Sequence, residues 1–144
     1  MKRLTLLLAL LVAVGGCSKP ENGASASATA SAAAANPASA SDGAVVYVTN
    51  CSSCHQADGK GVPGAFPPLA GNAVVTGSPV AVIAIVKGGL DGKVAVNGNV
   101  YSGIMPAWGG LLSDDQIAAA ITYIRSSWHN RATGVSAAQV AGVK

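Results

Sequence analysis

The apolar and polar positions of the 144-residue chain divide it into four stretches of different character. Residues 4–14 are an almost unbroken apolar run behind a short basic start. Residues 18–41 are almost wholly Ala, Ser, Asn, Gly, Thr and Pro and offer no large apolar side chain to a core. Residues 42–130 carry periodic apolar patterns, whereas residues 131–144 are small and polar. The chain therefore predicts one folded domain at 42–130, with a flexible segment before it and a flexible C-terminal tail after it.

Two helices are predicted in the first part of the domain. The first runs from near Asp42, a candidate N-cap, to Cys51. The second runs through the apolar residues 79–86, with Ser78 at its N-cap, proline at its first position and Gly88 as its stop signal. Because this second helix is apolar nearly all round, we expect it to be largely buried.

A third helix is predicted after Ser113, which begins a capping box with Gln116 and places two acidic residues at the positive end of the helix. Its apolar residues recur at helical spacing and form one stripe: Ile117, Ile121, Ile124 and Trp128. Residues 94–101 differ, because an Asn-Gly pair flanked by β-branched residues is typical of a tight hairpin. The patterns thus predict an all-α domain with a short β-hairpin near 94–101.

Residues 1–16 have the pattern of a signal peptide. Their apolar run is too short to span a bilayer, and it leads to the sequence Val-Gly-Gly-Cys at residues 14–17. That sequence resembles the lipobox of bacterial lipoproteins, which implies that Cys17 becomes the lipidated first residue after cleavage. We expect residues 17–41 to be a flexible tether on the periplasmic side of a membrane. Since Ser18 is not the Asp associated with inner-membrane retention, the outer membrane is favoured in a Gram-negative host. Plain secretion, with Cys17 removed, is the alternative.

The folded domain is close to electrically neutral, although the whole chain has a formal net charge of +3. Its four basic side chains are Lys60, Lys87, Lys93 and Arg125, and its five acidic ones are Asp42, Asp58, Asp91, Asp114 and Asp115. We therefore expect neither a basic patch for nucleic acid nor a strong field that steers a partner.

The most specific chemical signal is Cys-Ser-Ser-Cys-His at residues 51–55. Two thiols and an imidazole at this spacing are what covalent attachment of a c-type haem requires. Cys51 and Cys54 add to the haem vinyl groups, and His55 is placed as an axial ligand of the iron. The chain offers too few further ligands for a zinc site. A redox-active dithiol is the main alternative, although this pair follows a predicted helix instead of opening one.

The second axial ligand has two candidates after the predicted signal peptide. Met105 is the only methionine there, and Gly103 and Pro106 beside it impose an irregular backbone that suits presenting a ligand from a loop. A lone methionine more often fills a core. His129 is the only further histidine, and we expect it to cap the last helix. Met105 is therefore the preferred ligand, with core packing and bis-histidine ligation as the alternatives.

Residues 42–130 resemble the bacterial class I, or monohaem, cytochromes c. The likeness rests on four segments: Gly43, Tyr47 and the attachment motif; Phe66-Pro67-Pro68-Leu69-Ala70-Gly71; Met105-Pro106; and Ile121-Thr122-Tyr123-Ile124-Arg125. It implies a small cytochrome c fold with three to four helices around one covalent haem c. Gly43 and Tyr47 would pack across the last helix, where a glycine permits close approach. Tyr101 and Trp108 would either face the haem or its propionates, or take part in ordinary packing.

The resemblance also implies a role for each residue of the site. The two cysteines would carry the thioether bonds, and His55 and Met105 would ligate the iron. The Pro67 carbonyl would accept a hydrogen bond from Nδ1 of His55, which fixes the orientation and basicity of the ring. Leu69 would line the haem pocket. The residues expected to bind the cofactor are thus Cys51, Cys54, His55, Pro67, Leu69 and Met105.

Methionine and histidine ligation in an apolar pocket favours ferrous iron and leaves no open position for a substrate. We therefore expect a one-electron carrier with no catalytic residue, which passes electrons between redox partner proteins. The expected protein is a monomer attached to the membrane through its lipid. Two alternatives remain: a haem subunit of a larger oxidoreductase, and a haem enzyme or sensor whose sixth position opens.

Overall fold

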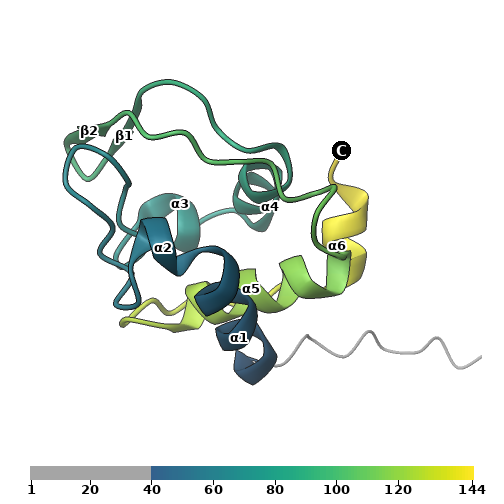
Figure 1. Ribbon diagram of the computed structural model, residues 1–144. Coiled ribbons are helices and arrows are strands. Elements are labelled where there is room, and N and C mark those ends of the chain that lie inside the picture. Colours follow the sequence, from purple (N-terminus) through teal and green to yellow (C-terminus); the bar gives the residue numbers. More distant parts are fainter. Residues whose placement is uncertain (1–39) are drawn as a thin grey trace, which may run out of the picture. The chain divides into compact units, whose positions relative to one another are not determined.

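The computed structural model describes residues 40–144, which contain six helices and two strands (Figure 1). In chain order they are α1 (Ala40–Asn50), α2 (Ser52–His55), α3 (Ala73–Thr76), α4 (Pro79–Gly88), β1 (Val94–Val96), β2 (Asn99–Tyr101), α5 (Asp114–Ser126) and α6 (Ala137–Gly142). The predicted helical class with one small hairpin is confirmed. None of the described helices is long and apolar enough to cross a membrane.

The predicted N-terminal appendages lie largely outside the described residues. These are the signal peptide at 1–16, the lipidation site Cys17 and all but the end of the tether at 17–41. The last two residues of the predicted tether belong to α1. The folded part of the chain therefore begins slightly earlier than the sequence pattern predicts.

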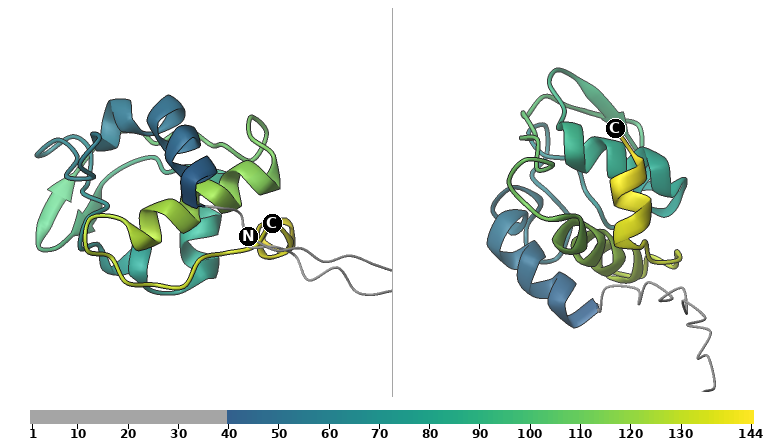
Figure 2. Two further views of the ribbon diagram at one scale, coloured as in Figure 1. Left: turned by 90° about the horizontal axis from the view of Figure 1, so that it is seen from below. Right: turned by 90° about the vertical axis from the view of Figure 1, so that its right-hand side faces the viewer.

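α1 and α5 pack directly against each other, and Figures 1 and 2 show α1 lying across α5. Gly43 is buried at this crossing. A Cβ atom there would overlap the carbonyl oxygen of Ala119 and the side chain of Tyr123. Tyr47, one turn later in α1, is fully buried. The close approach expected at Gly43 is present, and it requires a residue without a side chain because backbone atoms cannot move aside cheaply.

α5 begins at the predicted capping box. Oγ of Ser113 accepts a hydrogen bond from the backbone N–H of Gln116 at 3.2 Å, and the backbone N–H of Ser113 donates to the side-chain Oε1 of Gln116 at 2.9 Å. Trp128 lies beyond the end of the helix. The other members of the predicted apolar stripe are buried in the core, where each contributes about 2 kcal/mol of hydrophobic stabilisation; they are Ile117, Ile121 and Ile124.

Two details of the predicted helices are wrong. Only Val82 and Ile83 of α4 are fully buried, and Val80 is 59% exposed, so α4 is not the largely buried helix that its composition suggests. A helix that is apolar on every side gives no sign of which side faces the core. Asp42 lies in the first turn of α1 and not at its N-cap, a position where its charge still suits the helix dipole.

The predicted hairpin is confirmed. β1 and β2 pair antiparallel, with Val94 opposite Tyr101 and Val96 opposite Asn99. The two turn residues, Asn97 and Gly98, have φ angles of 51° and 80°. Positive φ at both central positions defines the type I′ turn, whose twist matches that of the flanking strands.

The prediction of a flexible tail at 131–144 is wrong. Residues 137–142 form α6, which packs on α5, and Val135 and Val140 are fully buried in the core. Lys87 of α4 donates from Nζ to the Val140 carbonyl at 3.0 Å and to the Val143 carbonyl at 2.6 Å. A cation from another helix thus satisfies the negative end of this short helix, a long-range contact that the tail's own composition does not reveal.

Candidate functional site

The attachment motif directly follows α1, and its last four residues form the whole of α2. Cys51 occupies the N-cap position of α2, and His55 is its last residue. The side chain of His55 is 8% exposed, and Cys51 and Cys54 are partly buried cysteines outside any disulfide. The C-cap residue after α2 is Gln56, whose φ is 61° and whose carbonyl accepts a hydrogen bond from the Tyr47 hydroxyl at 2.5 Å. The first helix therefore fixes the position of the histidine.

The ring of His55 is held by one backbone oxygen. Nδ1 lies 3.0 Å from the Pro67 carbonyl, the contact that the family resemblance implies. A carbonyl can only accept, so Nδ1 carries the proton and donates, and Nε2 is left with its lone pair. Burial lowers the pKa of His55, an effect that the bond to Pro67 partly offsets. A neutral imidazole with its Nδ1–H already bound is the form that ligates a metal.

Cys51 does not have the character of a reactive redox thiol. Burial, with a smaller contribution from Cys54, raises the pKa of Cys51 to about 11. Reactive cysteines in thiol–disulfide enzymes have pKa values below the ordinary one, because the thiolate is the nucleophile. Among the described residues, no cluster of three or more His, Cys, Asp or Glu side chains could hold a metal ion. The dithiol and zinc alternatives therefore find no support in the described part of the chain.

The loop that carries Pro67 is held close to the motif by backbone contacts. The Gly61 amide donates to the His55 carbonyl at 3.0 Å, and the amides of Leu69 and Ala70 both donate to the Gly59 carbonyl. A Cβ atom at Gly61 would overlap the carbonyl oxygens of Phe66 and Pro67, so glycine is needed for this approach. Leu69 lines a cavity that His55 also lines, as expected for a pocket residue.

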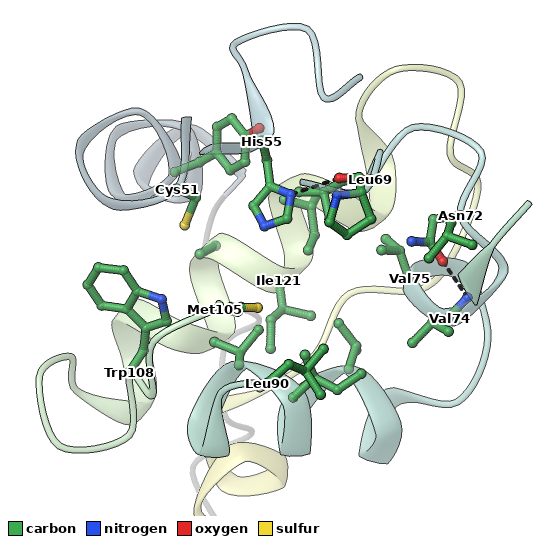
Figure 3. A pocket seen from close by; sticks show the side chains of 18 of the residues that line it. Cys51, His55, Leu69, Asn72, Val74, Val75, Leu90, Met105, Trp108 and Ile121 are labelled. Carbon is green, nitrogen blue, oxygen red and sulfur yellow. Dashed lines mark hydrogen bonds between the residues drawn. The ribbon is translucent and has the colours of Figure 1, made fainter. Parts of the chain in front are cut away.

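Met105 lies in the segment between β2 and α5, about fifty residues after the attachment motif. It forms an isolated antiparallel bridge with Leu90, in which each amide donates to the other's carbonyl at 2.9 Å. The segment is therefore more regular than the predicted loop. Figure 3 shows the side chains of His55 and Met105 both directed into the same cavity, with the Met105 sulfur between Trp108 and Ile121.

Two adjoining cavities, of about 220 and 260 Å³, meet at the attachment motif. Both candidate ligands belong to the wall that the cavities share, which consists of Cys51, His55, Pro67, Leu90, Val94, Met105 and Trp108. Cys54 lines the second cavity. The remaining wall of the first is almost wholly apolar, with Leu69, Val75, Ile85, Val86, Leu112 and Ile121 among its residues. An apolar space with two thiols and two iron-binding side chains in its wall fits a covalently attached haem.

Other residues in the sequence prediction are not part of this wall. His129 is exposed and lines neither cavity, and Tyr101 is buried without lining either of them. The expected histidine does not cap the end of α5. Instead, Oγ of Ser127 donates to the Tyr123 carbonyl at 2.7 Å. Of Tyr101 and Trp108, only Trp108 lines the cavities, whereas Tyr101 is buried away from them.

Two buried asparagines near the site escaped the sequence analysis. Asn72 lines the first cavity, where its Oδ1 caps α3 at the Val74 amide and its Nδ2 donates to the Pro68 carbonyl at 2.8 Å. Asn130, 4% exposed, hydrogen-bonds both α5 and the segment after Pro68. Nothing in the sequence distinguishes these residues from polar loop residues, because the groups that they bind are distant in sequence or belong to the backbone.

A helical domain with a Cys-x-x-Cys-His motif at an apolar cavity defines a c-type haem protein. A family model described as "Cytochrome c" matches residues 40–128, and the chain belongs to the cytochrome c family. Accordingly it carries one covalent haem c and is an electron-transfer protein rather than an enzyme.

Relatives of two kinds are similar to this chain. Cytochrome c-552 of Thermus thermophilus is 40% identical over 91 residues, which are 60% of this chain and 68% of that protein. The cytochrome c subunit of the quinone alcohol dehydrogenase of Komagataeibacter europaeus is 40% identical over 115 residues, 78% of this chain and 24% of the subunit. The cytochrome subunit of fructose dehydrogenase of Gluconobacter japonicus is 39% identical over 111 residues, 72% of this chain and 22% of the subunit. The alignment thus spans about a quarter or less of the two dehydrogenase subunits.

Proposed function

We propose that His55 and Met105 are the two axial ligands of the iron and that the protein is a one-electron carrier with both axial positions filled. The observation that carries this proposal is the shared wall of the two cavities, which contains both side chains together with Cys51. When bound, the haem supplies a redox-active iron and a conjugated ring through which an electron can enter and leave.

The residues of the chain have distinct parts in this function. Pro67 holds the His55 ring in one orientation and makes it a stronger donor through the Nδ1–H bond. The Met105 thioether is a soft, weak donor, which favours the ferrous state. The apolar wall excludes water from the neighbourhood of the iron, so little solvent has to reorient when the charge changes. No side chain has to transfer a proton or form a covalent intermediate.

The test of this function is optical absorption of the purified protein in the oxidised state, in the reduced state and in the reduced state with carbon monoxide. We expect a c-type reduced spectrum that carbon monoxide does not change, and in the ferric protein the weak charge-transfer band of methionine sulfur. A shift with carbon monoxide and absence of that band would show an open sixth position. The haem enzyme or sensor would then replace the carrier as the best description.

The physiological partners are proposed to be redox proteins, one a donor and the other an acceptor. The similarity to cytochrome subunits of alcohol and fructose dehydrogenases favours a second candidate, in which this domain is the haem-bearing subunit of a larger dehydrogenase. The two differ in whether the partner is permanent. Purification in mild detergent at low ionic strength separates them, because a subunit leaves the column with a dehydrogenase in fixed ratio, whereas a free carrier is recovered as a monomer.

We also propose that the protein is exported and anchored to the membrane through a lipid on Cys17, followed by the tether. This rests on the apolar N-terminal run and its lipobox-like end. Cys17→Ser is expected to move the protein from the detergent phase to the aqueous phase of a Triton X-114 separation, with the haem spectrum unchanged. Recovery of the unaltered protein in the aqueous phase, or an N-terminal peptide without acyl mass, would point to plain secretion.

A further inference from the structure

The turn that follows α5, residues 127–130, has an unusual backbone. Trp128 and His129 have φ angles of 51° and 68°, so two consecutive residues with bulky side chains adopt left-handed conformations. Residues other than glycine rarely adopt this conformation, and they keep it only where the surrounding contacts over-determine it. The contacts around this turn therefore hold it in a strained conformation.

The first set of contacts comes from Trp128. Its Nε1 donates to the Ala57 carbonyl at 3.2 Å, two residues after His55. The indole lies so close to Gly59 that a Cβ atom there would overlap the ring. On its other sides the ring meets Tyr47 and Tyr123, at centroid distances of 5.1 and 5.6 Å. Trp128 thus holds the chain just after the histidine against α1 and α5.

The second set comes from Asn130. Nδ2 donates to the Leu69 carbonyl at 3.0 Å and to the Ile124 carbonyl at 2.7 Å, and Oδ1 accepts from the Gly71 amide at 2.9 Å. Both donor hydrogens and the acceptor of this amide are used. Because the side chain is 4% exposed, water cannot readily replace these bonds. Asn130 thus holds the segment that begins two residues after Pro67.

The two held segments also bind each other, since the amides of Leu69 and Ala70 donate to the Gly59 carbonyl. The turn therefore constrains both sides of the bond between Nδ1 of His55 and the Pro67 carbonyl. We propose that Trp128 and Asn130 are positioning residues, which act through these two segments to set the strength of the His55–Pro67 hydrogen bond. The inference rests on the proposed role of His55 as an iron ligand.

The expected consequence follows from the chemistry of imidazole. A short Nδ1–H bond to a carbonyl makes Nε2 a better electron donor, which favours ferric iron. Loosening either segment lengthens this bond on average, weakens the donation of His55 and makes the reduction potential more positive. It also exposes the Nδ1 proton to solvent more often.

The test uses the full holoprotein with two neutral substitutions, Asn130→Ala and Trp128→Phe. The first removes all three amide contacts, and the second removes the Nε1 donor while keeping an aromatic ring. Val140→Ala is the control, because it destabilises the core at α6 without touching either held segment. The readouts are the solvent exchange rate of the His55 Nδ1 proton, measured by NMR, and the reduction potential.

We expect proton exchange about tenfold faster in Asn130→Ala than in the unaltered protein, as for the loss of one typical hydrogen bond, and a more positive potential. Trp128→Phe should change the exchange rate and the potential in the same direction but by less. If Asn130→Ala does not fold, Trp128→Phe alone tests the inference. Values no different from those of Val140→Ala would overturn the inference. If the unaltered protein shows no iron-shifted His55 resonances, the proposed ligation itself is wrong, which is a separate result.

Discussion

Met105→Leu is expected to convert the protein from a closed electron carrier to a haem protein with an open sixth position. The ferrous form should then bind carbon monoxide, and the ferric form should lose the methionine-sulfur charge-transfer band. The reduction potential should fall by about 0.1 V or more, a fraction of the roughly 0.8 V over which axial ligands set haem potentials. Leucine preserves the volume of the side chain, so the fold should survive.

This result has a direct physical basis. Met105 lies in the wall shared by the two cavities, and its backbone is fixed to Leu90 by two hydrogen bonds, so the segment keeps its place when the sulfur is removed. Ile104→Leu is the matched control, since the neighbouring side chain is 68% exposed and offers no donor atom. An unchanged charge-transfer band in Met105→Leu would show that another group is the sixth ligand.

The second large effect is expected from Arg125, a buried cation near the end of α5. Its side chain is 3% exposed. Nη1 donates to the carbonyls of Val75 and Gly77, at 2.6 and 3.1 Å, and Nε donates to the Thr133 carbonyl at 2.6 Å. Burial lowers the pKa of Arg125, but an arginine remains charged in a protein. One guanidinium therefore joins α5, the end of α3 and the C-terminal segment.

Arg125→Ala is expected to lower the free energy of unfolding by about 3 kcal/mol, because it leaves backbone carbonyls without their donors and opens a cavity beside them. Denaturant unfolding measures this, and the midpoint should fall with an unchanged slope. Arg131→Ala, at an exposed arginine nearby, is the control and should stay within about 0.5 kcal/mol of the unaltered protein. Equal losses in the two variants would mean that the buried contacts add nothing to stability.

The parts of the fold that the sequence predicts well are those specified by neighbouring residues. The capping box at Ser113, the Asn-Gly turn at 97–98 and the glycine at the helix crossing each need only a few residues to be recognised. The errors concern contacts over long distances. α6 is ordered by Lys87, some fifty residues earlier, and the outward face of α4 follows from where its partners lie.

The candidate site divides in the same way. The two thiols and the histidine lie within five consecutive residues, so their spacing alone indicates a haem. Met105 can be selected because it is the only methionine after the predicted signal peptide. Pro67 and Leu69 have no such mark, and only the likeness to a family connects them with the motif. Neither a motif nor the family likeness points to Asn130, because its three hydrogen-bonding partners are backbone groups and backbone groups leave no pattern in the sequence.

The crossing of α1 and α5 has a consequence for the order of events during export and folding. α1 leads into the attachment motif, yet its main packing partner begins at Asp114, about sixty residues later. Until α5 has followed it to the exported side of the membrane, α1 has nothing to pack against, and an isolated helix of its length is marginal in water. The thiols of Cys51 and Cys54 therefore remain accessible during this interval, a period in which an attachment machinery can reach them before the last helices close the domain.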